Sequence, residues 1–311
     1  MKKNTLAIVA ILYCFTSVLA QNNSVAELLG YEPDTKLLII HADDLGVAHS
    51  ENMASISGLE ESPVNSGSIM VPCPWFPEIA MYARNNKSAD LGLHLTLNSE
   101  WKNYKWGPVT SKSLVSSLVN NNGYFYSVVD SLVMYAKPKE IEIELRNQVR
   151  KAIQFGVDVT HLDAHMGAAM STPEFLESYI KIGREFELPV LLDKRMPFLK
   201  EDKISALVDE RTVIVDFTAT ANPSDFENGM DHYYTETLEN LKPGLNCLLI
   251  HLAYDDDEMK AMTVDHPYWG SAWRQADYNF FTSEKCATIL KEQNIKLVTW
   301  RELRDKIVRK E

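Results

Sequence analysis

Cysteine is scarce in this chain, with four in 311 residues and no Cys-x-x-Cys pair. Cys14 lies near the start, and Cys73, Cys247 and Cys286 are widely spaced. This pattern argues against a disulfide framework and against a zinc site made of thiolates. One disulfide plus a free thiol stays open, but three small buried side chains are the favoured interpretation.

Basic residues are also fewer than acidic ones, with 31 Lys and Arg residues and 43 Asp and Glu residues. The formal net charge at pH 7 is -12. An acidic chain of this kind repels the phosphate backbone, so we expect no nucleic acid partner.

Long apolar runs are missing except near the start, where residues 6–19 follow two lysines and lead into Ala20. A basic start, a short apolar stretch and small residues at its end are typical of a secretory signal peptide, here residues 1–20. The stretch is shorter than the roughly 20 residues of a membrane span. We therefore predict a secreted or periplasmic protein, residues 21–311, with no stable membrane span after cleavage.

No internal repeat, low-complexity tract or linker rich in Pro and Gly divides residues 21–311, which predicts one domain. Short apolar segments alternate with helical patterns, as in a parallel sheet with helical crossovers. The predicted fold is an α/β, single-domain (β/α) barrel, either closed or distorted and incompletely closed. The predicted strands lie near residues 37–42, 66–71, 91–97, 157–163, 189–193, 212–217, 246–252 and 295–299.

The clearest helical pattern covers residues 138–155. Pro138 suits the first turn and Gly156 suits the stop. Its predicted apolar stripe consists of Ile141, Leu145, Val149 and Ile153.

Residues 98–136 lack a clear element and are predicted to be an insertion above the barrel mouth. This stretch and the segment after the seventh predicted strand are rich in aromatic residues. Flat aromatic faces suit sugar rings, although clustered Trp and Tyr more often simply pack. The candidate substrate-binding residues are Trp101, Trp106, Trp269, Trp273 and, at the end of the fifth predicted strand, Arg195.

Two adjacent carboxylates, Asp43 and Asp44, close the first apolar segment. Burying one ionised carboxylate is costly, and burying two side by side is worse unless a metal or shared protons remove the repulsion. The pair therefore indicates a metal-dependent active site.

Histidines also occur on two further predicted strands. Because side chains alternate between the two faces of a strand, their positions show which face they share. In residues 91–97 the leucines share one face while His94 lies on the other. In the fourth strand His161, Asp163 and His165 fall on one face, towards the carboxyl end. In barrel folds that end of the strands is the catalytic face.

Three ordered motifs give the chain a specific resemblance. They are His41-Ala-Asp-Asp-Leu-Gly46, Gly92-Leu-His-Leu-Thr-Leu97 and Thr160-His-Leu-Asp-Ala-His165, with a weaker fourth in Cys247-Leu-Leu-Ile-His251. The chain resembles the YdjC family of carbohydrate deacetylases, of the chitooligosaccharide deacetylase (ChbG) type. The resemblance implies a barrel-like α/β fold and removal of N-acetyl groups from amino sugars with one divalent metal ion.

The resemblance also implies a role for each matching residue. Asp44, His94 and His165 would be the metal ligands, Asp43 the general base and His251 the acid that protonates the leaving amine. Two imidazoles and one carboxylate leave coordination positions open, as a catalytic zinc or magnesium site needs. Asp43 is expected to point the other way from Asp44 at the strand end. His161 and Asp163 are candidates for orienting a ligand imidazole, or for simple hydrogen bonding in the core.

The chain departs from the family pattern after two motifs. Met166-Gly-Ala follows His165 in place of further histidines, and Leu-Ala-Tyr follows His251 in place of Pro-Gly. Members resembling the chitooligosaccharide enzyme act in the cytoplasm, whereas this chain has a predicted signal peptide, so its substrate is expected to differ.

The leading hypothesis is a secreted metal-dependent deacetylase that hydrolyses an N-acetyl or other acyl group on an amino sugar or glycan. A secreted carbohydrate-binding protein without catalysis is the first alternative. A non-haem iron oxygenase, which uses a similar ligand set on another scaffold, is the second. The sequence leaves the metal (Mg or Zn), the sugar and a homodimer open.

Overall fold

The computed structural model of the protein describes residues 24–310. The predicted signal peptide, residues 1–20, lies outside the described residues. Within the described part of the chain, no helix is long and apolar enough to cross a membrane.

One parallel sheet forms the centre of the structure, with the strand order β4-β3-β2-β1-β6-β5. The short strand β7 pairs with the start of β1. The strands are β1 (Lys36–Leu45), β2 (Ser66–Ile69), β3 (Leu91–Leu95), β4 (Leu162–Ala164), β5 (Phe217–Thr220), β6 (Gly244–Ile250) and β7 (Lys296–Leu297).

Between β4 and β5 the sheet is held only by single bridges. Leu162 pairs with Val190, and Asp193 pairs with Val215. The predicted barrel is therefore confirmed in its distorted, incompletely closed form. Residues 189–193 do not form the regular strand that the sequence predicts, and β4 begins later than the predicted segment at 157–163.

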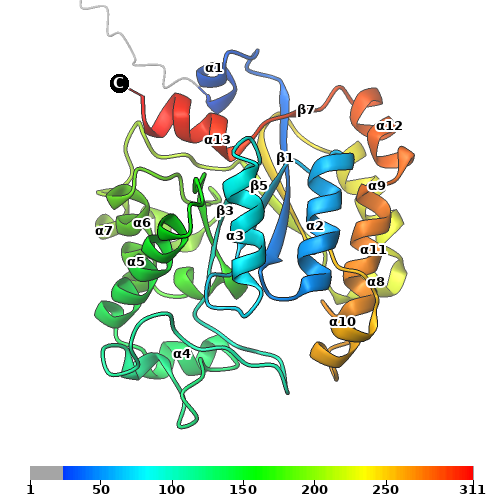
Figure 1. The fold of residues 1–311 in the computed structure, drawn as a ribbon. Coiled ribbons are helices and arrows are strands. Elements are labelled where there is room, and N and C mark those ends of the chain that lie inside the picture. The colour runs from blue at the N-terminus through cyan, green and yellow to red at the C-terminus, as the bar shows by residue number, and fades with distance from the viewer. Residues whose placement is uncertain (1–23, 311) are drawn as a thin grey trace, which may run out of the picture.

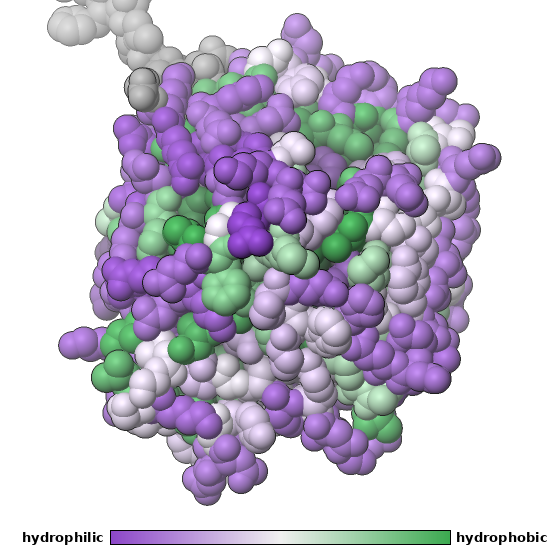
Figure 2. All heavy atoms as spheres, in the orientation of Figure 1, coloured by the Kyte–Doolittle hydropathy of each residue, from purple (hydrophilic) through white to green (hydrophobic). Residues whose placement is uncertain are grey.

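Helices surround the sheet on its outer side (Figure 1). In the same orientation the surface is largely hydrophilic, with small separate apolar patches (Figure 2). The α-helices are α1 (Val25–Leu29), α2 (His49–Glu61), α3 (Phe76–Asn85), α4 (Val129–Tyr135), α5 (Pro138–Gln154), α6 (Pro173–Glu185), α7 (Asp202–Ser205), α8 (Pro223–Asn228), α9 (Met230–Glu239), α10 (Asp257–Met262), α11 (Ser271–Phe281), α12 (Glu284–Glu292) and α13 (Trp300–Leu303). Three 3₁₀ turns, η1 (Ser116–Leu118), η2 (His165–Met170) and η3 (Pro197–Lys200), and one π turn, η4 (Arg304–Val308), complete the described helical elements.

Helix α5 confirms the predicted 138–155 helix but corrects its apolar stripe. Ile141, Leu145 and Val149 are buried, whereas Ile153 is 49% exposed and Ala152 is buried in its place. Each step of four residues turns 400° around a helix, so a strict i, i+4 series drifts off the buried face and a step of three restores it.

Alternation along β1 divides its side chains between two environments. Leu38, Ile40 and Ala42 pack in the large cluster beneath the helices. Leu37 and Ile39 pack in a second cluster with residues of α1 and of the C-terminal helical turns. These helical segments lie at the amino-terminal end of the strands (Figure 1). His41 and Asp43 continue the row of Leu37 and Ile39, so this face of β1 changes from apolar to polar towards the carboxyl end of the strand.

Cys73, Cys247 and Cys286 are free and buried. This confirms the interpretation of all three as small core residues and leaves no disulfide between them.

Candidate active site

The backbone at the end of β1 brings both adjacent carboxylates to one cavity. Asp44 has a φ of +68°, in the left-handed region, and the β1–β2 register shifts between Ala42 and Leu45. This conformation costs about 1 to 2 kcal/mol for an L-residue, and Asp is one of the side chains that tolerate it. Asp43 and Asp44 therefore line the same cavity, which corrects the expectation that they point opposite ways.

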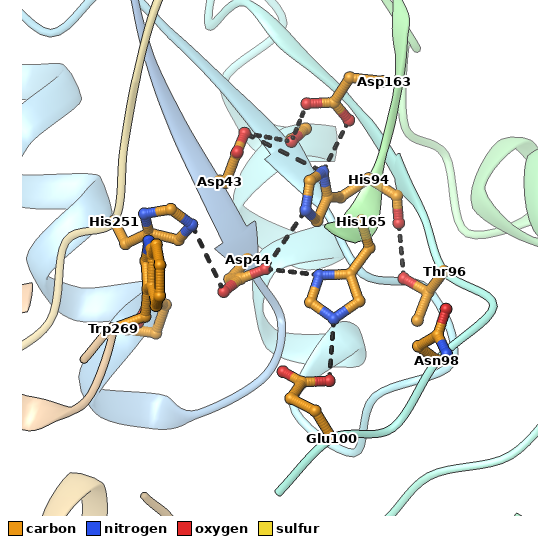
Figure 3. A network of polar contacts seen from close by, with 12 residues as sticks. Asp43, Asp44, His94, Thr96, Asn98, Glu100, Asp163, His165, His251 and Trp269 are labelled. Atoms are coloured by element: carbon orange, nitrogen blue, oxygen red, sulfur yellow. Dashed lines mark hydrogen bonds and ion pairs between the residues drawn. The ribbon is translucent and has the colours of Figure 1, made fainter. Parts of the chain in front are cut away.

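Three potential metal ligands converge on this cavity. Asp44 Oδ1 lies 3.3 Å from His94 Nε2 and 3.2 Å from His165 Nδ1. All three ligand atoms lie within 4.8 Å of one another, and their residues are buried. In Figure 3 both imidazoles face Asp44 from β3 and the end of β4.

A second carboxylate fixes the orientation of each imidazole. His94 Nδ1 donates to Asp163 Oδ1 over 2.8 Å, and His165 Nε2 donates to Glu100 Oε2 over 3.0 Å. In neutral imidazoles the nitrogens that face Asp44 then carry lone pairs. Because Asp44 Oδ1 is itself buried without a hydrogen-bond donor, three acceptors meet at one point. A divalent cation satisfies all three, so the donor set fits a metal site.

The charges around Asp44 keep it ionised. Burial alone raises the pKa of this carboxyl, but Arg274 and His165 hold the pKa well below its usual range. Burial lowers the pKa of His165, and the carboxylates of Glu100 and Asp44 raise it to about 10. Protons and a divalent cation thus compete for the same nitrogen.

Asp43 belongs to a buried network beside the three potential metal ligands. Its Oδ1 lies 3.1 Å from His41 Nε2 and accepts from Ser68 Oγ over 3.3 Å. The same His41 nitrogen is 2.9 Å from Asp163 Oδ2. Burial lowers the pKa of His41, but Asp163 and Asp43 raise it to about 10. A protonated His41 therefore compensates the two carboxylates.

His251 faces Asp44 from the side opposite the two metal-facing histidines (Figure 3). Its Nε2 lies 4.0 Å from Asp44 Oδ2, and its backbone N–H donates to Asp277. Burial lowers the pKa of His251 to about 4, with the charge of Arg274 adding to the effect and Asp44 opposing it. The resting imidazole is therefore neutral near pH 7 and can donate a proton only after it has gained one.

His161 lies deeper in the barrel than the metal-facing histidines. Its Nδ1 bonds Thr160 Oγ1 over 2.9 Å, and its ring stacks on Trp300. Gly92 makes room for it, because a Cβ there would lie 2.4 Å from the imidazole. Within residues 24–310, His161 makes no hydrogen bond to His94 or His165, whereas Asp163 bonds His94 directly.

The cavity that contains the cluster measures about 660 Å³. Trp101 and Trp269 line it, and Trp269 is 37% exposed. Trp273 is 1% exposed beneath Trp269, with ring centroids 4.8 Å apart, so it supports that ring and offers no face to a ligand. Trp106 is buried and bonds the carbonyl of Asn98. Arg195 pairs with Asp193 and lines a separate cavity beside β5.

Sequence reasoning missed three charged residues at this site. Glu100 comes from the predicted insertion, which lies next to the cavity as expected. Arg274 on α11 is buried and pairs with Asp44 and with Glu51 on α2. Burial raises the pKa of Glu51 to about 8. The positive charge of Arg274 opposes this rise, and the negative charge of Asp44 adds to it.

Comparison with known proteins identifies the family of this chain. The profile described as YdjC-like protein matches residues 37–292. The chain belongs to the YdjC-like family. It is 30% identical to a carbohydrate deacetylase of Thermus thermophilus, over 87% of this chain and 94% of that protein. A carbohydrate deacetylase of Thermoanaerobacter pseudethanolicus is 26% identical, over 85% of this chain and 98% of the relative.

A solved structure shows the same fold. It is an Enterococcus faecalis protein to which cellobiose-phosphate cleavage is ascribed, similar with a TM-score of 0.72 at 20% identity, over 86% of this chain and 99% of the other. The profile and the Thermus thermophilus relative confirm the predicted YdjC-like family, and none of these matches singles out its chitooligosaccharide type.

In this YdjC-like site, Asp163→Asn should weaken metal binding about 10-fold to 100-fold, because the carboxylate that orients a ligand histidine is lost. Titration with a competing chelator measures the affinity. Glu100→Gln should weaken metal binding by a similar factor, because Glu100 orients His165. His161→Ala is the matched control, with a smaller loss expected, and an equal loss in all three variants would contradict an orienting role for Asp163.

Proposed function

We propose that this YdjC-like protein is a metal-dependent carbohydrate deacetylase that hydrolyses an N-acetyl or other acyl group on an amino sugar or glycan. The observation that carries the proposal is the convergence of Asp44, His94 and His165 in a cavity that also contains Asp43. Curated relatives that align over most of the chain are carbohydrate deacetylases, which supports it further.

A divalent ion bound by the three ligands would polarise the acyl carbonyl and lower the pKa of an attacking water. Asp43 is the proposed base. His41 and Ser68 hold its Oδ1, while among the described residues no hydrogen bond engages Oδ2, which is therefore available to accept a proton. Exposed Trp269 beside His251 offers a flat face for a sugar ring.

The parallel barrel argues against the oxygenase alternative, which normally uses an antiparallel scaffold. The hydrogen-bonded Asp43 argues against a protein that only binds carbohydrate, because binding alone has no need for a second buried carboxylate beside the ligands.

Release of acetate from a panel of N-acetylated and O-acetylated glycans tests the proposed function. The protein should be loaded with zinc or magnesium in separate samples and its metal content measured. Metal-dependent acetate release from an amino sugar is the expected result. Glycan binding without acetate release by fully loaded protein would favour the binding alternative.

His251→Ala should damage deacetylation of an N-acetyl sugar far more than hydrolysis of 4-nitrophenyl acetate. An amine leaves only when protonated, whereas an activated phenolate leaves unaided. Both rates are measured on one preparation of known metal content. Equal losses on the two substrates would assign His251 a structural role.

We also propose secretion or export to the periplasm, on the pattern of residues 1–20. N-terminal sequencing of protein recovered from each cell fraction should find Gln21 first outside the cytoplasm. Full-length chain confined to the cytoplasm would contradict export.

A further inference from the structure

Arg274 lines the cavity and forms hydrogen bonds with three separate segments of the chain. Its side chain is 2% exposed. Nη2 donates to Asp44 Oδ2 over 2.6 Å, Nη1 donates to Glu51 Oε2 over 2.8 Å, and Nε donates to the backbone carbonyl of Trp269 over 2.8 Å. Its guanidinium also lies 5.5 Å from the ring of Trp101. One buried side chain thus contacts a proposed metal ligand and two of the aromatic residues that line the cavity, Trp101 and Trp269.

The contact with Asp44 decides which oxygen faces the histidines. Arg274 engages Oδ2, and Oδ1 is left between His94 and His165. A carboxylate free to rotate would present either oxygen, whereas a planar guanidinium anchored at three points fixes its plane. Glu51 on α2 holds the guanidinium from the other side.

The contact with Trp269 stabilises an unfavourable backbone. Trp269 has a φ of +55°, a conformation that a bulky side chain rarely adopts, and Asp265 in the same loop has a φ of +65°. Strained backbone of this kind persists only where the surroundings hold it. Here the hydrogen bond from Arg274 and the stack on Trp273 do so. The exposed Trp269 ring lies next to His251 at the cavity (Figure 3).

We propose that Arg274 is a positioning residue that holds the metal-facing Asp44 and the loop of residues 265–270, including Trp269, in one fixed arrangement. The part that concerns the sugar rests on the proposed deacetylase function, and the part that concerns the metal does not. In this arrangement the same side chain sets the geometry of the metal ligand and the place where a sugar ring stacks.

Arg274→Lys tests the proposal because it keeps the positive charge beside Asp44. A lysine ammonium cannot bond Asp44, Glu51 and the Trp269 carbonyl at the same time. A change in zinc affinity, amide exchange or KM would therefore reflect the loss of these hydrogen bonds and not the loss of charge. We expect a 10-fold to 100-fold loss of zinc affinity by chelator competition. Faster amide hydrogen exchange in residues 265–270 of the metal-free protein is expected as well, together with a higher KM for an N-acetyl glycan.

Arg304→Lys is the matched control. Arg304 is also buried and bonds a carboxylate, Asp158, and the Val159 carbonyl, outside the cavity. It should leave zinc affinity and loop exchange within twofold of wild type. Trp269→Ala should raise KM and leave zinc affinity unchanged, and adding it to Arg274→Lys should raise KM less than the product of the single effects.

Folded Arg274→Lys protein with wild-type zinc affinity or wild-type exchange in residues 265–270 would overturn the proposal. So would a similar zinc loss in Arg304→Lys, because it would show a general effect of removing a buried guanidinium. If zinc affinity and exchange change as expected while wild-type protein releases no acetate from any glycan, the positioning role stands and the proposed deacetylase function fails.

Discussion

Asp43→Asn should retain its metal and lose most of its deacetylase activity, with kcat reduced roughly 10²-fold to 10⁴-fold. The amide keeps the shape of the side chain, and its oxygen can still accept from Ser68 beside His41. The amide at position 43 in this variant cannot take a proton from water, unlike the carboxylate that it replaces. Rates are measured on protein whose metal content and melting temperature match those of wild type.

Two outcomes would contradict this assignment. A metal-loaded Asp43→Asn variant with wild-type turnover would show that another group accepts the proton. A variant that folds but loses its metal would show that Asp43 contributes to metal binding, as its place in a second group with His94 and Asp163 would allow.

Removal of any one proposed ligand should abolish tight metal binding, because two remaining protein ligands hold a divalent ion weakly. We expect His94→Ala, His165→Ala and Asp44→Gly to be isolated with little bound metal and no measurable deacetylation. Glycine is chosen at position 44 because it adopts a positive φ without strain. Elemental analysis of each purified variant gives the metal content.

His266→Ala is the matched control for these three variants. His266 also lines the cavity but lies outside the groups that could hold a metal. It should keep full metal content. Full metal occupancy in His94→Ala, His165→Ala or Asp44→Gly would remove that residue from the proposed ligand set.

The sequence predicts the parallel barrel and the meeting of metal-capable side chains because both depend on local regularities, whereas the choice of Asp44, His94 and His165 as ligands rests on the family resemblance. Alternation along the strand sorts His94 from its leucine neighbours, and the i, i+2, i+4 series places Asp163 and His165 on one face. Parallel strands then bring their carboxyl ends together. The apolar pattern of residues 189–193 predicts a regular strand as well, but in the structure these residues form only isolated bridges with the neighbouring segments.

The charged residues around the ligands have no local pattern. Arg274 meets Asp44 across 230 residues of sequence, and Glu100 meets His165 across 65. Such contacts depend on how loops and helices meet in three dimensions, which periodicity does not encode. The left-handed backbone of Asp44 likewise accompanies a register shift between strands, so alternation alone gives the wrong direction for the Asp44 side chain.

Glu100 belongs to the insertion between β3 and α5, although its partner His165 follows β4. Exchange of this insertion between relatives, by recombination or by protein engineering, would therefore alter the metal-facing histidine as well as the substrate preference. A transplanted loop without an acceptor at this position would leave one metal-facing imidazole free to rotate or to change tautomer. Loops in this family that accept new sugars should thus keep a carboxylate near position 100, and chimaeras without it should require more metal to reach full activity.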